Sequence, residues 1–432
     1  MFSQRLPWHL PTNPLTAALE DLRQREQAVC DLTIANPTIA LPQLYDDAIR
    51  RALAGLGSPS ALRYEPTPRG LLSCRQAIAA YYARRGIDIN PEHLMLCAST
   101  SEAYSWLFQL LCDPGDGVLF PQPSYPLIDH LAQLSSVQVV PYALRFCGDH
   151  FALDAQSLDG PAEAQIGTQD PDKQGVRTRA LVSISPNNPT GSVLQRSDLI
   201  TLHAACRKRN LALIVDEVFS DYLFTDHEGE EVPRSDEDSA LPSVLCAEAR
   251  AIANKEGQAA PLTFVLSGLS KVLGLPQLKL GWIHISGPEP LRTQAQDRLE
   301  LIADTFLSVS TPVQLAAPDL LAQQPRLAND IRQHLQHNLK TVKRELAGSA
   351  LSVLPVDGGW YAVLRLPAVL SEEDWALRFL VKDRVLVHPG YFFDLHEPGK
   401  AFAVISLLTA TPDFLHGVRS LRDRVTQELS RE

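Results

Sequence analysis

One lysine near the middle of the chain has surroundings in which its amine could do chemistry. Lys271 lies in the segment SGLSKVLGLPQLKLGWI, among apolar and small residues, and a second lysine, Lys279, follows eight positions later. A lysine amine in an apolar setting can attack an aldehyde and form a Schiff base. An isolated lysine is more commonly a solvated side chain, so this segment alone leaves both interpretations open.

A carboxylate and an amide follow two other apolar runs. Asp216 ends the run LALIVD, where an unpaired charge would be costly to bury. It could be a helix N-cap or an ion-pair partner, or it could pair with the protonated ring nitrogen of a pyridine cofactor. Asn188 lies in SPNNPTG, where Pro and Gly indicate a turn that can point an amide into a site. Taken alone, this motif is an ordinary turn.

A hydroxyl-rich turn precedes a helical segment in ASTSEAY, which contains Thr100 and Ser101. The free N–H groups at a helix N-terminus bind phosphate, so these residues could hold one. An ordinary N-cap with Glu102 in the first turn fits the same letters.

The elements that must position these residues form an alternating pattern of strands and helices. Strand-like runs lie within 92–100, 115–126, 178–191, 211–222, 262–271 and 278–286. Such runs, separated by helices, predict a three-layer α/β fold with a mostly parallel central sheet covered on both faces. Ligands of such sheets bind beyond the carboxyl ends of the strands, where the residues above fall. We therefore expect those residues to converge.

Composition limits the class of protein. The 432 residues carry a net charge of −11 with no basic stripe, which argues against nucleic-acid binding. The seven cysteines form no C-x-x-C pair, and no zinc-ligand spacing is present, so we expect reduced cysteines, no metal and a cytoplasmic location. The N-terminus lacks a signal-peptide pattern, and no apolar run could cross a bilayer.

Two polar stretches, 160–178 and 226–261, are expected to be inserted surface loops. A helix-rich segment begins near residue 290. A smaller α+β part follows, with strands expected near 358–367, 384–391 and 401–409.

The motifs gain meaning from their order along the chain. In sequence they read LTIANPT, RYEPTPRG, STSEAYSWLFQLLCDPGD, PSYP, SPNNPTG, VDEV, SGLSK, LKLGW, GGWYAVLRLP and HPGYFF. This ordered set resembles the fold type I pyridoxal-phosphate enzymes, specifically the class I/II aminotransferase family, over nearly the whole chain. The resemblance implies a large cofactor-binding domain at 41–312. It also implies a small domain made of 1–40 and 313–432, which closes over the substrate.

The resemblance also implies roles for individual residues. Lys271 matches the lysine that forms the Schiff base with pyridoxal 5'-phosphate and then moves a proton as general base and acid. Asp216 matches the carboxylate that keeps the ring nitrogen protonated. Asn188 matches the donor to the phenolic oxygen, and Tyr125 matches the ring that stacks on the cofactor.

The remaining matches concern the phosphate and a partner subunit. Thr100 and Ser101 match the phosphate-binding turn, and Ser270, next to the Schiff-base lysine, matches a cofactor-binding position. Tyr64 matches a tyrosine that reaches the phosphate of a neighbouring subunit, which implies a homodimer with shared active sites.

Three positions depart from the family pattern. Lys279 stands where arginine is usual, and it supplies a point charge instead of a planar fork. Phe219 replaces a tyrosine that donates to the phenolic oxygen, which predicts a higher pKa for the Schiff-base nitrogen. Val404 falls where an arginine grips the substrate carboxylate.

Three explanations for Val404 remain open. Arg69 or Arg365 could take over the carboxylate, the substrate could be an amine without an α-carboxylate, or transamination could be lost.

The leading function is therefore an aminotransferase acting on a small-molecule amino donor and a keto or aldehyde acceptor. A pyridoxal-phosphate lyase, such as a carbon–sulfur lyase, uses the same Lys271 and Asp216, and no residue separates the two. A non-catalytic binding protein on this fold is the third alternative, which retention of both residues disfavours.

Overall fold

The fold is built around one large sheet. The computed structural model describes residues 2–3, 5–6, 13–159, 176–224, 240–255 and 259–430, so most of the first predicted inserted loop, 160–178, lies outside the described residues. The second, 226–261, is described at 240–255 and 259–261, and there the prediction of a surface loop is wrong, because helix α8 (Ala247–Lys255) packs Ala249 and Ile252 into the core. Eight strands are arranged in the order β2-β9-β8-β7-β6-β3-β4-β5. In chain order they are β2 (Leu94–Cys97), β3 (Gly117–Gln122), β4 (Gln138–Phe146), β5 (Phe151–Leu153), β6 (Thr178–Ile184), β7 (Ala212–Asp216), β8 (Thr263–Gly268) and β9 (Gly281–Ser286).

The centre of this sheet is parallel and its edges are antiparallel. Strands β4, β3, β6, β7 and β8 run parallel to their neighbours, whereas β9, β2 and β5 join antiparallel. The predicted mostly parallel α/β sheet is confirmed. Since β6, β7 and β8 are adjacent and parallel, their carboxyl ends meet at one edge of the sheet.

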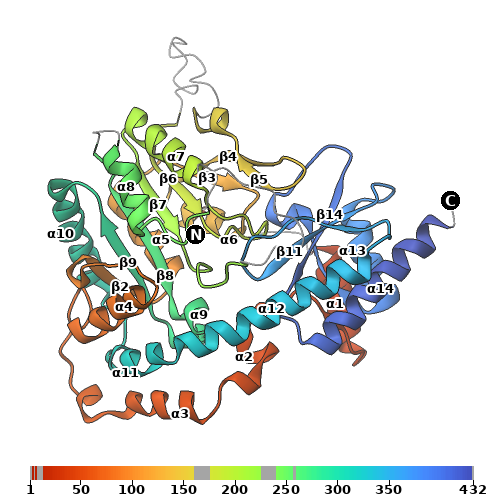
Figure 1. The fold of residues 1–432 in the computed structure, drawn as a ribbon, viewed down its shortest axis with the longest axis horizontal. Helices are drawn as coiled ribbons and strands as arrows, with labels where there is room; N and C mark the ends of the chain where they lie inside the picture. The colour runs from red at the N-terminus through yellow and green to blue at the C-terminus, as the bar shows by residue number, and fades with distance from the viewer. Residues whose placement is uncertain are drawn as a thin grey trace.

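Helices cover both faces of the large sheet (Figure 1). Along β3, Leu119 packs in one core while Val118 and Phe120 pack in the other, as the period of two in a strand requires. One face carries α4 (Leu72–Arg84), α7 (Arg196–Arg209), α8 (Ala247–Lys255) and α11 (Thr311–Ala322). The other carries α5 (Thr100–Leu111), α6 (Leu127–Leu134) and α10 (Glu289–Phe306). Burial on both faces explains why these strands are continuous apolar runs.

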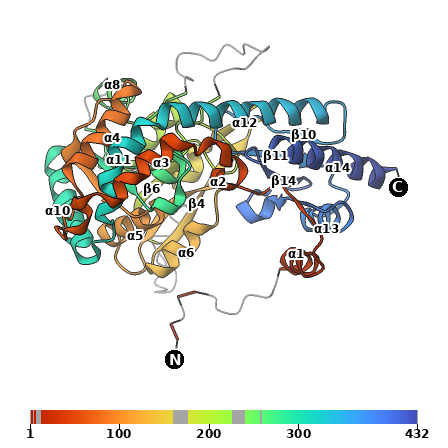
Figure 2. The same cartoon turned by 90° about the horizontal axis from the view of Figure 1, so that it is seen from below.

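A second, smaller sheet lies beside the large one (Figures 1 and 2). It is antiparallel, in the order β10-β11-β14-β13. Its strands are β10 (Ser352–Val353), β11 (Tyr361–Leu366), β13 (His388–Pro389) and β14 (Ala401–Ser406). It shares a core with α12 (Gln324–Leu346), α13 (Glu372–Asp383) and α14 (Thr411–Leu429). The long helix α12 runs from the large sheet's helices to this smaller sheet.

The N-terminal segment joins the smaller sheet's surroundings. Helix α1 (Pro14–Gln24) packs against α13, and β1 (Cys30–Asp31) pairs in parallel with β12 (Val385–Leu386). The short helices α2 (Pro37–Ala40) and α3 (Asp47–Leu53) then lead toward the large sheet. Within the described ranges, no helix is long and apolar enough to cross a membrane.

Candidate active site

A cavity of about 360 Å³ lies at the carboxyl ends of β6, β7 and β8. The structure brings eight of the nine predicted site residues to its wall: Thr100, Ser101, Tyr125, Asn188, Asp216, Ser270, Lys271 and Lys279. Tyr361, the first residue of β11, comes from the smaller sheet to the same wall. The cavity therefore lies between the two sheets.

Lys271 occupies the short helix α9 (Leu269–Val272), which follows β8 directly. The hydroxyl of Tyr222 donates to its backbone carbonyl at 2.6 Å and fixes the turn. Its Nζ lies 4.4 Å from the ring centroid of Trp360 and 5.3 Å from that of Phe219. Burial lowers the pKa of this amine to about 8, and the negative charge of Asp216 opposes that shift. A buried amine that gives up its proton this readily can act as a nucleophile and a base.

Asp216 is the last residue of β7 and is 8% exposed. The backbone N–H of Val218 donates to Oδ1 at 3.1 Å, and the hydroxyl of Tyr104 donates to Oδ2 at 3.1 Å. Burial raises the pKa of this carboxyl to about 6, while both donors and the charge of Lys271 act in the opposite direction. Asp216 is therefore mainly a carboxylate at neutral pH, in a position where its charge is poorly screened.

The N-terminus of α5 supplies an anion site to the same cavity. Ser99 caps the helix, and its side chain accepts from the N–H of Glu102 at 3.2 Å. The first helical residues, Thr100 and Ser101, thus present backbone N–H groups where the helix dipole favours negative charge. Lys279 lines the same wall and adds a full positive charge. A phosphate group fits this donor set.

Two further groups suit an aromatic ring with a polar substituent. The side-chain amide oxygen of Asn188 is buried without a hydrogen-bond partner in the part of the chain that the structure describes. Tyr125 is half-exposed at the cavity, with its ring 6.3 Å from that of Phe393. A buried carboxylate, a polar amide, an aromatic ring, an anion site and a lysine amine match pyridoxal 5'-phosphate group by group.

Three residues of this site were missed in the sequence. Tyr104 lies one helical turn after Thr100, in the motif ASTSEAY, from which only a phosphate site was predicted. Trp360 and Tyr361 lie in GGWYAV, a motif that contributes to the family resemblance but does not predict that these side chains reach the active site. The i, i+4 spacing of Thr100 and Tyr104 is the one signal that could have placed the tyrosine on the same helix face.

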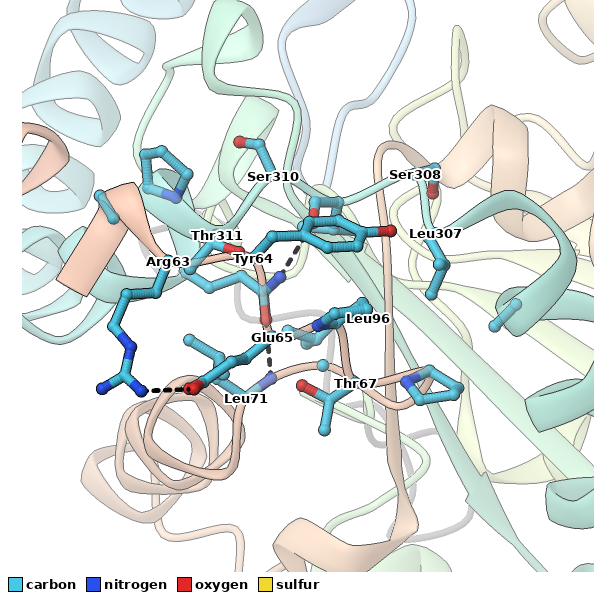
Figure 3. Close-up of a pocket in the computed structure, with 18 of the residues that line it drawn as sticks. Arg63, Tyr64, Glu65, Thr67, Leu71, Leu96, Leu307, Ser308, Ser310 and Thr311 are labelled. Carbon is cyan, nitrogen blue, oxygen red and sulfur yellow. Dashed lines mark hydrogen bonds and ion pairs between the residues drawn. The ribbon is translucent and has the colours of Figure 1, made fainter.

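Tyr64 does not line this cavity. It lies at a second cavity of about 290 Å³, formed by residues 61–71 together with the segment that follows α10 (Figure 3). Its side chain is 80% exposed, and its hydroxyl points to the side where Leu307 and Ser308 lie. An ion pair of 2.9 Å between Arg63 and Glu65 borders the same cavity.

Val404 is fully buried in β14. It pairs with Val363 on β11 and with His388 on β13, so it shares the sheet face of Tyr361. Neither predicted substitute reaches the cavity wall. The Nε of Arg69 donates to Glu300 at 2.6 Å, and the Arg365 guanidinium lies 5.4 Å from the Phe146 ring centroid. Among the described lining residues, the cations are Lys271 and Lys279.

Comparison with known proteins agrees with this geometry. The family model described as aminotransferase class I and II matches residues 28–407. The chain therefore belongs to the class I and II aminotransferases, which confirms the family resemblance. It is a pyridoxal-phosphate-dependent transaminase.

Relatives and solved structures are similar over nearly the full length. The chain is 26% identical to the glutamate-pyruvate aminotransferase AlaA of Escherichia coli K12, over 91% of this chain and 90% of the relative. It is 26% identical to an alanine aminotransferase of Mycobacterium tuberculosis, over 92% and 90%. The solved alanine aminotransferase of Pyrococcus furiosus matches with a TM-score of 0.80 at 21% identity, covering 99% of this chain and 100% of that one. That structural likeness establishes the fold.

Proposed function

We propose that Lys271 is the residue that bonds to the cofactor and that its amine then carries the proton in each half-reaction. When bound, pyridoxal phosphate supplies an aldehyde that captures amines and a ring that withdraws electrons from the bond to be broken. The observation that carries this proposal is the buried Lys271 amine, whose pKa is lowered to about 8, in one cavity with the Asp216 carboxylate. An amine with this pKa can both accept and return a proton near neutral pH.

The other predicted residues would hold the cofactor in place. Asp216 would face the ring nitrogen, and Asn188 would bond the phenolic oxygen. Tyr125 would lie against the ring face. The phosphate would lie at the α5 N-terminus, held by Thr100 and Ser101, with Ser270 and Lys279 contributing from the side of the Schiff-base lysine. These assignments follow the charge and hydrogen-bonding capacity of each group on the cavity wall.

For the substrates, we propose an amino donor and a keto or aldehyde acceptor small enough for the cavity beside the cofactor. The relatives named for glutamate, pyruvate and alanine make these compounds the first to test. No arginine is among the described lining residues to grip a carboxylate. Simple amines without a carboxylate therefore belong in the same test.

We also propose a homodimer in which Tyr64 serves the partner's cofactor site. Large apolar side chains are exposed at the wall of the second cavity, at Leu62, Tyr64 and Leu307, and Leu301 and Phe306 are exposed on α10, which precedes Leu307. An exposed apolar cluster of this kind suits a protein–protein contact. Tyr64 itself lies at the second cavity and is not on the wall of its own chain's active-site cavity, which fits a role in another subunit.

The proposal extends to organisation and location. We expect 41–312 to act as the cofactor-binding domain and 1–40 with 313–432 as the small domain, closing over the substrate. Tyr361, which the smaller sheet contributes to the cavity wall, would move with that closure. We expect a cytoplasmic protein, because its seven cysteines are free in the structure, six of them in the described core or partly buried beside it.

The test is the visible absorption spectrum of the purified, pyridoxal-phosphate-loaded protein. It is recorded before and after adding glutamate, alanine, other amino acids and simple amines, with the keto products assayed. Bleaching of the band by one donor, with formation of its keto product and recovery on adding a keto acid, supports the proposal. Release of ammonia with no recovery would identify a lyase instead.

A further inference from the structure

Tyr104 contacts Asp216 in a way that assigns it a task of its own. We propose that Tyr104 is a positioning residue, which fixes the Asp216 carboxylate in one orientation and keeps its negative charge available to the cofactor's ring nitrogen. This inference rests on the proposed function, in which Asp216 faces that nitrogen.

The contact comes from two elements that meet inside the core. Tyr104 lies one turn into α5 and is 3% exposed, and Asp216 ends the neighbouring strand β7. The tyrosine hydroxyl donates to Oδ2 and the Val218 N–H donates to Oδ1, each at 3.1 Å. Each carboxylate oxygen therefore has one protein donor, and both oxygens keep lone pairs for an incoming N–H group. With one donor on each oxygen, the carboxylate cannot rotate freely.

The hydroxyl, not the ring, carries this task. The Tyr104 ring packs in the core beside Phe108, with centroids 6.0 Å apart, and a phenylalanine would fill that space equally well. A buried hydroxyl that found no partner would cost free energy. Its one described partner is the Asp216 carboxylate. The position thus carries a polar atom whose use is to bond that carboxylate.

The hydrogen bond from Tyr104 also affects how a proton is shared between Asp216 and a ring nitrogen that faces it. Burial makes Asp216 more basic, and a donor to its oxygen makes it less so, because the donor stabilises the anion. The other ionisable groups near the pair are Lys271, which faces Asp216, and Glu217 and Tyr142, whose negative forms oppose further charge. A ring nitrogen that faces Asp216 competes with it for one proton. Loss of the Tyr104 donor should move that proton toward Asp216.

The experiment compares Tyr104→Phe with Tyr142→Phe. Tyr142 is a matched control, because its hydroxyl is also buried and donates to a carbonyl, that of Val182, at 2.8 Å. The first readout uses the cofactor-free protein with ¹³C-labelled aspartate. The Asp216 carboxyl signal is identified by its absence in Asp216→Asn. Tyr104→Phe should raise the pKa of Asp216 from about 6 by roughly one unit, and Tyr142→Phe should leave it unchanged.

The second readout uses protein loaded with pyridoxal phosphate that is ¹⁵N-labelled in the ring. In Tyr104→Phe, the ring-nitrogen signal should move toward the unprotonated position at a given pH, and kcat should fall roughly tenfold or more. Tyr142→Phe should resemble the parent in both measurements. Melting temperatures of the two variants report any general loss of packing.

The two readouts separate the possible failures. If Tyr104→Phe shifts neither signal more than Tyr142→Phe does, while Asp216→Asn shifts the ring nitrogen, the inference about Tyr104 is wrong. If the ¹³C signal shifts but the ring nitrogen ignores both Tyr104→Phe and Asp216→Asn, the proposed role of Asp216 is wrong instead.

Discussion

The two sheets contribute to the active site in opposite ways. The large sheet places two buried ionisable residues at the cavity. Asp216 is the last residue of β7, and Lys271 lies in the short helix that follows β8. The smaller sheet presents Tyr361 to the cavity and a fully buried Val404 on the same sheet face. The charged groups of the proposed cofactor site thus lie at the end of one sheet, and the other sheet contributes the Tyr361 side chain to the cavity wall.

The difference follows from the energetics of buried charge. A charged group held away from water costs stability unless it is paired or hydrogen-bonded, so the buried charges of the cavity need partners. Asp216 has two donors and Lys271 lies near aromatic rings and the opposite charge of Asp216. Val404 needs no such support. The proposed cofactor site is therefore identifiable from its charged residues, whereas Val404 and its neighbours on the smaller sheet are held by apolar packing.

Removing the amine on the charged side should have the largest effect. Lys271→Met keeps the side-chain length and should lower kcat at least about 10³-fold, because the nucleophile and the base are lost together. Lys208→Met is the control, because Lys208 is an exposed lysine paired with Asp159. Single-turnover formation of the keto product measures both. Retention of more than a tenth of the activity in Lys271→Met would contradict the assignment.

The same substitution should stabilise the cofactor-free protein. Below pH 8, the lysine is protonated in the folded and unfolded states, and the buried charge costs on the order of 3 kcal/mol. Between about pH 8 and the ordinary lysine value of 10.5, the unfolded chain binds the extra proton, so parent stability rises with pH. Denaturant unfolding from pH 7 to 10.5 should therefore show a gain for Lys271→Met that shrinks with pH. A gain that is constant with pH would contradict the lowered pKa.

Trimming the smaller sheet should affect stability and leave cofactor binding unchanged. Val404→Ala leaves a cavity in the core and should lower the free energy of unfolding by about 1–3 kcal/mol. The affinity for pyridoxal phosphate should stay within about twofold, since Val404 is fully buried and is not among the residues of the cavity wall. Val363→Ala, at the paired position on β11, is the matched control. A large loss of cofactor affinity specific to Val404→Ala would show that this strand shapes the cofactor half as well.

The smallest expected effect concerns Phe219. Its ring lies 5.3 Å from the Lys271 amine, and a tyrosine there would add a phenol donor beside the cofactor. In the loaded enzyme, Phe219→Tyr should lower the pH midpoint of the visible absorbance change by about one unit, because the donor stabilises the deprotonated form. A spectrophotometric pH titration of parent and variant measures it. An unchanged midpoint would reject the argument.

The sequence revealed the residues that follow strands more readily than those brought in by packing. Asp216 ends a buried run, and Asn188 and Lys271 follow shortly after two neighbouring ones. Parallel topology places such positions at one edge of the sheet. The same apolar runs predicted the mostly parallel sheet, which the structure confirms. Trp360, which directly precedes β11, contacts the amine of Lys271, and no local sequence pattern records such a contact between distant segments.

Side-chain direction set a second limit on prediction. The sequence shows that residue 104 is a tyrosine, but only the folded structure shows that its hydroxyl, on α5, donates to Asp216 at the end of β7. The tie between Arg69 and Glu300 likewise depends on helix α10 passing beside the PTPRG turn. From the sequence, Arg69 was a candidate to replace the missing arginine, but in the folded structure its side chain pairs with Glu300.

The central claim is that Lys271 is the lysine that bonds to the cofactor, and chemical trapping tests it most directly. The protein loaded with pyridoxal phosphate is reduced with borohydride, digested and mapped by mass spectrometry. Lys279 on the same cavity wall serves as an internal competitor. We expect the added mass of the cofactor at Lys271 in the peptide that contains this residue. We also expect no visible absorption band in Lys271→Met. Attachment at Lys279, or no stable attachment at any lysine, would contradict it.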